Sequence, residues 1–245
     1  MSMAKEKVTP YKESEKGKKE QVAEMFDNIA PKYDFLNHFF SMGIDIQWRK
    51  KVRKMVHMKN VESILDLATG TGDLAIALHK PGISIKGVDI SAGMLDVARE
   101  KVKAKGLDKD IELILGDAEN LPFPDNHFDV ITVSFGARNF ENLEKGLKDM
   151  LRTLKPDGRI FILEFSKPTK TPFKQFYHFY FRYIMPGIGK LVSKDNAAYT
   201  YLPESVKAFP FGDEFLEIMT RCGYKQAKCR PLTMGIASIY SGGKQ

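Results

Sequence analysis

One short stretch, residues 64–74 with the sequence I-L-D-L-A-T-G-T-G-D-L, constrains the fold of this chain more than any other. Its apolar start is typical of a buried strand, and two glycines spaced Gly-x-Gly separate that strand from a helical pattern. Glycine lets the backbone turn tightly and lets a bulky ligand lie against it. A strand, a glycine turn and a helix in this order predict a nucleotide-type binding site.

Acidic residues close the next two predicted strands. Asp89 ends the run 83–88, at about the spacing where an acid meets the hydroxyl pair of a ribose. Asp117 and Ala118 follow the run 111–115, where an acid and a backbone amide can hydrogen-bond an adenine edge. These positions predict that the ligand is a cofactor that contains adenosine.

The glycine turn leaves more than one cofactor open. Gly70-x-Gly72-x-x-Ala75 also fits the dinucleotide pattern, in which alanine can replace the third glycine. Asp66, within the first strand, favours S-adenosyl-L-methionine, because an acid there can organise the loop that faces a charged amino-acid group. The motifs that follow resemble, in their order, those of the class I methyltransferases. Another nucleotide ligand on a doubly wound sheet is the alternative.

Alternating strands and helices predict an α/β protein, a Rossmann-like domain with a mostly parallel seven-stranded sheet. The 245 residues suffice for one large domain. We expect a flexible polar N-terminus (1–20) and a single methyltransferase domain (21–245). Its parts would be an N-terminal helical lid (21–60), a cofactor-binding core (61–168), an aromatic helical insertion after the fifth strand that covers the substrate (169–210), and a C-terminal helix with strands (211–245).

Local signals predict where several helices begin and end. Pro31 is expected to end the first helix, whose apolar stripe begins at Val22. Ser91 is expected to cap the helix after Asp89, and Gly106 to terminate it. Gly223 is expected to end the last helix in the same way.

Composition restricts the classes of partner and site. The formal net charge is +7 and the basic residues are dispersed, so an anionic membrane surface suits the chain as well as nucleic acid does. Cys222 and Cys229 form no Cys-x-x-Cys pair and the five histidines are scattered, which predicts neither a metal site nor a disulfide framework. The N-terminus lacks a secretory pattern and no apolar run is long enough to span a bilayer, which favours a cytoplasmic protein.

A second set of motifs is more specific than the glycines. These are F-D-N-I-A-P-K-Y-D-F-L-N at 26–37, M-G-I-D at 42–45, S-F-G-A-R-N at 134–139, L-E-F-S-K-P at 163–168 and Y-x-Y-L-x-x-S-V at 199–206. Through them the chain resembles the UbiE/MenG/COQ5 family of quinone-biosynthesis C-methyltransferases. The resemblance extends from about Val22 to the C-terminus.

The resemblance implies methyl transfer from S-adenosyl-L-methionine to a ring carbon of a prenylated quinol, without a metal. Demethylmenaquinol is the favoured substrate, and 2-polyprenyl-6-methoxy-1,4-benzoquinol is the alternative, or both are used. The family pattern and the glycine argument together place cofactor-binding positions at Gly70, Thr71, Gly72, Asp89, Asp117, Ala118 and Ser134.

Arg138 and Asn139 are the expected catalytic residues, because they directly follow Ser134 at the mouth of the expected site. They could orient a water or a quinol oxygen, and Arg138 could stabilise a developing phenolate. Arginine stays protonated, so an electrostatic role suits it better than that of a base. A structural salt bridge is the alternative for Arg138. Tyr33 and Asp34 would either close a lid on the cofactor or cap and pack a helix.

Seven aromatic residues fall within residues 173–183. They predict either a helix packed on the core or a cover for the quinol ring and its isoprenoid tail, including peripheral contact with an anionic membrane. His178, among them, is more often a packed residue than a base. Pairing of the chain into a homodimer stays open.

Three other functions would each be recognised by a different observation. Amine-directed nucleic-acid methyltransferases commonly carry Asn/Asp-Pro-Pro-aromatic after the fourth strand, where this chain has Ser134 to Ala137, so no nucleic-acid partner is expected. A nicotinamide-dependent oxidoreductase would prefer NAD over S-adenosylhomocysteine. A non-catalytic binding module would show no turnover.

Overall fold

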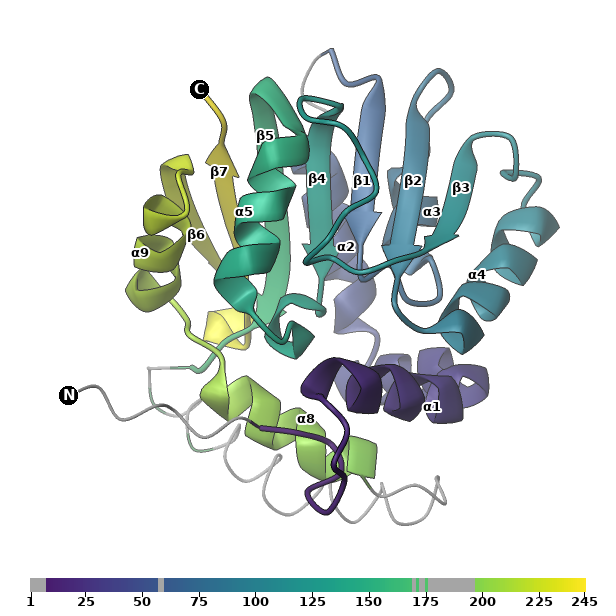
Figure 1. The fold of residues 1–245 in the computed structure, drawn as a ribbon, viewed down its shortest axis with the longest axis vertical. Helices are drawn as coiled ribbons and strands as arrows, with labels where there is room; N and C mark the ends of the chain where they lie inside the picture. The colour runs from purple at the N-terminus through teal and green to yellow at the C-terminus, as the bar shows by residue number, and fades with distance from the viewer. Residues whose placement is uncertain (1–7, 57–59, 169–170, 172–174, 176–196) are drawn as a thin grey trace.

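The computed structural model describes residues 8–56, 60–168, 171, 175 and 197–245. Its centre is a seven-stranded sheet in the order β3-β2-β1-β4-β5-β7-β6 (Figure 1). Strands β1 to β5 run parallel, and β7 is antiparallel to both β5 and β6. The predicted mostly parallel, seven-stranded α/β fold is therefore confirmed. The strands are β1 (Ser63–Leu67), β2 (Ser84–Asp89), β3 (Ile111–Leu115), β4 (Phe128–Ser134), β5 (Leu154–Phe165), β6 (Lys225–Leu232) and β7 (Ala237–Gly243).

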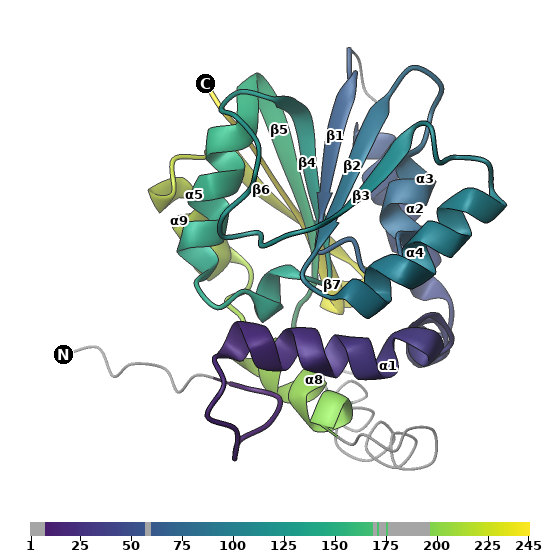
Figure 2. The same ribbon diagram turned by 45° about the vertical axis from the view of Figure 1, so that its right-hand side comes forward.

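Helices cover both faces of this sheet (Figure 2). Successive strand residues point to opposite faces, and Ile64 and Leu65 of β1 are both fully buried, one in each of two apolar clusters. This double burial explains why the central strands are continuous apolar runs. One face carries α2 (Ile44–Val56), α3 (Asp73–Leu78) and α4 (Ala92–Ala104), and the other carries α5 (Leu143–Thr153) and α9 (Asp213–Arg221).

Two further helices, α1 (Lys18–Ser41) and α8 (Ala197–Ala208), lie side by side across the carboxyl end of the parallel strands (Figures 1 and 2). The expectation that Pro31 ends the first helix is wrong, because α1 continues to Ser41 with Pro31 inside it. A proline in a helix costs about 3 kcal/mol. Ile29, Ala30 and Tyr33 pack against Met94 of α4 on either side of the proline, and this burial holds the helix together.

The other predicted helix ends agree with the structure. Ser91 caps α4, because its hydroxyl oxygen accepts a hydrogen bond from the backbone N of Met94 at 3.1 Å. Gly106 follows α4 with φ +66°, and Gly223 follows α9 with φ +104°. Both angles lie in the left-handed region that favours glycine after a helix.

The structure describes the N-terminal segment from Val8 onward, but only part of the predicted insertion. Val8 and Tyr11 pack against a small cluster of α1 and α8, so this part of the polar N-terminus has defined contacts. Most of the aromatic insertion, including His178, lies outside the described residues. In the described parts of the chain, no helix is both long enough and apolar enough to cross a membrane.

Candidate active site

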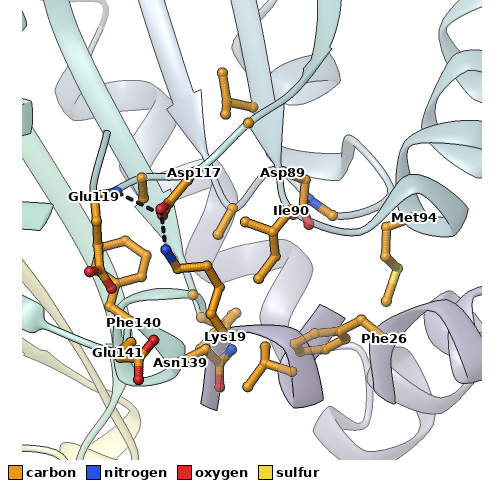
Figure 3. A pocket seen from close by; sticks show the side chains of 18 of the residues that line it. Lys19, Phe26, Asp89, Ile90, Met94, Asp117, Glu119, Asn139, Phe140 and Glu141 are labelled. Carbon is orange, nitrogen blue, oxygen red and sulfur yellow. Dashed lines mark hydrogen bonds and ion pairs between the residues drawn. The ribbon is translucent and has the colours of Figure 1, made fainter. Parts of the chain in front are cut away.

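A pocket lies where the carboxyl ends of β1 to β4 meet α1 (Figure 3). It contains about 660 Å³ of space not filled by atoms, including its open mouth. Six of the predicted site residues line it, namely Gly70, Asp89, Asp117, Ala118, Ser134 and Asn139. Thr71, Gly72 and Arg138 are not among its lining residues.

The glycine loop leaves bare backbone facing this pocket. Gly70 has φ +56°, and a Cβ built on it would meet no atom within 4 Å. Ala68, two residues earlier, also has a left-handed φ of +49°. Asp66 links the loop to β4. Its buried carboxylate accepts hydrogen bonds from the hydroxyls of Thr69 in the loop (2.7 Å) and Thr132 in β4 (2.6 Å). Asp66 thus organises the loop, as its position in the first strand suggests.

Burial raises the pKa of Asp66 from 3.8 to about 6, even though both threonine hydroxyls favour the carboxylate. The folded state therefore binds more protons than the unfolded chain between these two pH values. The stabilisation from this group is fully present below about pH 4 and is lost as the pH rises to about 6. A pKa shift of this size corresponds to about 3 kcal/mol in the free energy of unfolding.

Replacing Asp66 with asparagine is expected to remove this pH dependence. The free energy of unfolding of the parent should lose about 3 kcal/mol more than that of Asp66→Asn between pH 4 and pH 7. Denaturant unfolding at several pH values measures the difference. Asp96→Asn is the control, because the Asp96 side chain is 72% exposed. Parallel curves for the parent and Asp66→Asn would show that Asp66 ionises normally.

Asp89 connects the glycine loop to the start of α4. Its Oδ2 accepts a hydrogen bond from the backbone N of Gly70 at 2.8 Å, and its Oδ1 accepts one from the backbone N of Ser91 at 2.9 Å. Burial raises the pKa of this carboxyl group. An ionised carboxylate has about four acceptor positions, so each oxygen keeps capacity for a ligand hydroxyl.

Asp117 points into the pocket beside a lysine of α1 (Figure 3). Its Oδ1 accepts a hydrogen bond from the backbone N of Glu119 at 2.9 Å, and its Oδ2 forms an ion pair with Nζ of Lys19. Lys19 was not a predicted site residue. It lies 98 positions from Asp117 in a polar stretch, so no local pattern indicates the pairing. The apolar stripe of α1 was visible in the sequence, and its Val22 and Phe26 line the same pocket.

Thr71 and Gly72 do not line the pocket, but their contacts position the helices around it. The hydroxyl of Thr71 donates to Oδ1 of Asp34 at 2.5 Å, and Oδ2 of Asp34 pairs with Nζ of Lys101 at 2.7 Å. Since Asp34 belongs to α1 and Lys101 to α4, this network fastens α1 over the glycine loop. Gly72 allows α4 to approach, because a Cβ there would lie 3.3 Å from Cβ of Ala98.

Arg138 lies beside the pocket, in η1 (Ala137–Asn139). Its Nη1 pairs with Oε1 of Glu164 at 2.9 Å, and the two side chains are 7% and 0% exposed. The structural alternative for Arg138 is therefore realised, but its Nε remains buried without a partner among the described residues. Ser134 Oγ and Asn139 Oδ1 are also buried without a hydrogen-bond partner among the described residues. Buried polar groups without partners are rare in proteins, and two of these, Ser134 and Asn139, line the pocket.

Taken together, the lining residues fit an adenosine-containing cofactor. A bare glycine backbone, a carboxylate at the end of β2 and another after β3 stand in the order in which such a ligand is recognised.

Comparison with known proteins identifies the family. The model of the ubiE/COQ5 methyltransferase family matches residues 14–244. The chain belongs to this family. It is therefore an S-adenosyl-L-methionine-dependent methyltransferase, as the sequence predicts. A demethylmenaquinone methyltransferase of Bacteroides fragilis is 48% identical over the full length of both chains. A ubiquinone/menaquinone biosynthesis C-methyltransferase of Geotalea daltonii is 47% identical over 96% of this chain and 100% of its own.

Solved structures agree on the fold. The [4+2]-cyclase SpnF superimposes with a TM-score of 0.70 at 16% identity, covering 92% of this chain and 96% of its own. A structure described as a putative S-adenosyl-L-methionine-dependent methyltransferase from Methanococcus maripaludis has a TM-score of 0.60 at 18% identity, covering 100% of this chain and 97% of its own. At these identities the likeness shows a shared fold and nothing about activity.

Proposed function

We propose that this enzyme methylates a ring carbon of a prenylated quinol, with demethylmenaquinol as the favoured substrate. The observation that carries the proposal is the 48% identity over the full chain to a protein named demethylmenaquinone methyltransferase. A second protein of that name, from Porphyromonas gingivalis, is 43% identical over 97% of this chain and 98% of its own. The methoxybenzoquinol substrate stays the alternative, because the Geotalea relative is named for both quinone pathways.

The predicted cofactor positions take separate roles in this proposal. Asp89 would hold the ribose hydroxyls, and Asp117 with the backbone of Ala118 would hold the adenine. Gly70 and Ser134 would contact the ligand from the loop and from the end of β4. Thr71 and Gly72 would act indirectly, by fastening α1 and by letting α4 approach. When bound, the cofactor supplies a methyl group already activated by a positively charged sulfur.

The residues of η1 would prepare the quinol. A ring carbon becomes nucleophilic when a neighbouring hydroxyl ionises, and a fixed cation stabilises the resulting phenolate. Arg138 has such a charge, held in place by Glu164. Asn139, whose Oδ1 has no partner among the described residues, could orient the quinol oxygen or a water that takes up a proton. The helix α1 covers the pocket and would keep bulk water from the reacting atoms.

We further propose that the enzyme works in the cytoplasm, in peripheral contact with an anionic membrane. A prenylated quinol dissolves in the bilayer, and the chain has a formal net charge of +7, which favours anionic lipid surfaces. The aromatic residues Phe176, Phe179 and Tyr180 would contribute to this contact. These three lie outside the described residues, so the proposal rests on their sequence pattern.

Turnover of defined quinols tests the proposed function. The purified enzyme with S-adenosyl-L-methionine and each reduced quinol in turn is expected to give a larger kcat/KM for demethylmenaquinol than for the methoxybenzoquinol. Mass spectrometry of the quinone products provides the readout. A clear preference for the benzoquinol would reverse the choice of substrate, and no methylation of either would refute the proposed function.

A further inference from the structure

Tyr201, on α8, has a buried side-chain hydroxyl. Its side chain is packed with Val22 and Met25 of α1, and the residue is 3% exposed. Within the described part of the chain, its Oη makes no hydrogen bond. An unsatisfied buried hydroxyl costs about 1–3 kcal/mol, and a phenylalanine would fill the same space without that cost. The hydroxyl therefore calls for an explanation other than packing.

The helix that carries Tyr201, α8, packs against η1, the short helix that contains Arg138. Burial raises the pKa of Tyr201, while the charge of Arg138 acts to lower it and that of Glu164 to raise it. The phenol thus keeps its proton and remains a hydrogen-bond donor.

Glu164 accepts three hydrogen bonds, two of them from Arg138. Its Oε1 accepts from Nη1 of Arg138 and from the backbone N of Phe165, both at 2.9 Å. Its Oε2 accepts from the backbone N of Arg138 at 3.3 Å. The Nη1 of Arg138 also donates to the carbonyl oxygen of Phe135. The N–H of Arg138 Nε is a second buried donor without a partner among the described residues.

We propose that the Tyr201 hydroxyl and the Arg138 Nε–H form a two-donor site for one oxygen of the quinol. This inference rests on the proposed function, and it makes Tyr201 a further catalytic residue. Negative charge grows on that oxygen as the ring carbon becomes nucleophilic, and two preorganised donors stabilise it better than they stabilise the neutral hydroxyl. Tyr201 keeps its proton throughout and adds no step to the methyl transfer.

The test is Tyr201→Phe, compared with Tyr224→Phe as a matched control. Tyr224 is equally buried, at 1% exposed, but its hydroxyl donates to the carbonyl oxygen of Leu147 at 2.9 Å. Tyr201→Phe is expected to lower kcat about 10²-fold, the usual effect of losing one such donor. Its Tm should equal or exceed that of the parent, because no hydrogen bond is lost. Tyr224→Phe should show the opposite pattern, with a lower Tm and normal kcat.

Two further readouts separate catalysis from structure. The affinity for S-adenosylhomocysteine should be unchanged in Tyr201→Phe, because Tyr201 does not line the cofactor pocket. The pH at half-maximal kcat should rise, because the quinol hydroxyl ionises with less help. Normal kcat, or a loss of Tm like that of Tyr224→Phe, would overturn the assignment of Tyr201. A parent enzyme that methylates no quinol would instead refute the proposed function, and the parent is therefore measured first.

Discussion

Replacing Arg138 with alanine is expected to lower turnover about 10²–10³-fold, the loss that follows removal of one preorganised charge-stabilising group. The same change should lower the free energy of unfolding by about 3–5 kcal/mol, because it leaves the fully buried carboxylate of Glu164 without its partner. The affinity for S-adenosylhomocysteine should remain near that of the parent, since Arg138 does not line the candidate cofactor pocket. Steady-state kinetics, denaturant unfolding and calorimetry measure the three effects.

A double variant separates the two losses. Arg138→Met combined with Glu164→Leu removes both charges, and it should recover much of the stability while remaining inactive. Arg221→Ala is the control for loss of an ion pair, because Arg221 and Glu144 are 59% and 43% exposed and such pairs contribute about 0–1 kcal/mol. Normal turnover of Arg138→Ala with saturating quinol would show that the arginine is only structural.

Replacing Asp89 with alanine is expected to weaken S-adenosylhomocysteine binding by about 1.5–3 kcal/mol, the range for losing hydrogen bonds to a charged group. That corresponds to about a 10- to 150-fold larger Kd. Two causes act together, because Asp89 would bind the ribose and also holds the backbone N atoms of Gly70 and Ser91. Isothermal titration calorimetry gives the change in affinity directly.

Asp129→Ala is the matched control for Asp89→Ala. Oδ2 of Asp129 accepts hydrogen bonds from the backbone N atoms of Glu62 and Ser63 at 3.1 and 2.9 Å, so it also fastens a loop, but at the start of β4. Its loss should lower stability and leave cofactor affinity unchanged. Equal affinities of the parent, Asp89→Ala and Asp129→Ala for S-adenosylhomocysteine would show that Asp89 does not bind the ribose.

Positions that follow from local pattern and strand order could be predicted from the sequence. Gly70, Asp89, Asp117 and Ser134 each stand at the end of a predicted parallel strand or directly after it. Because β3, β2, β1 and β4 are neighbours in the sheet, their carboxyl ends meet at one edge, where α/β proteins bind ligands. Correct strand boundaries and strand order are therefore enough to bring these residues together.

Features that depend on pairing between distant segments could not be predicted. The pair of Arg138 and Glu164 arises because β4 and β5 are neighbours and Ser134 lies opposite Leu163. The approach of Lys19 to Asp117 depends on how α1 crosses the strand ends, which no periodicity specifies. The same crossing carries α1 through Pro31, because packing against α4 outweighs the local preference of proline.

Transfer of an isotopically labelled methyl group from S-adenosyl-L-methionine to reduced demethylmenaquinone tests the central claim most directly. The product is reoxidised, and mass spectrometry with NMR locates the label. We expect one labelled methyl group on a ring carbon, formed by the parent enzyme and strongly reduced in Arg138→Ala, with little product from the oxidised quinone because it has no hydroxyl to ionise. Label on a quinol oxygen, or no label in the quinone at all, would contradict ring-carbon methylation at this site.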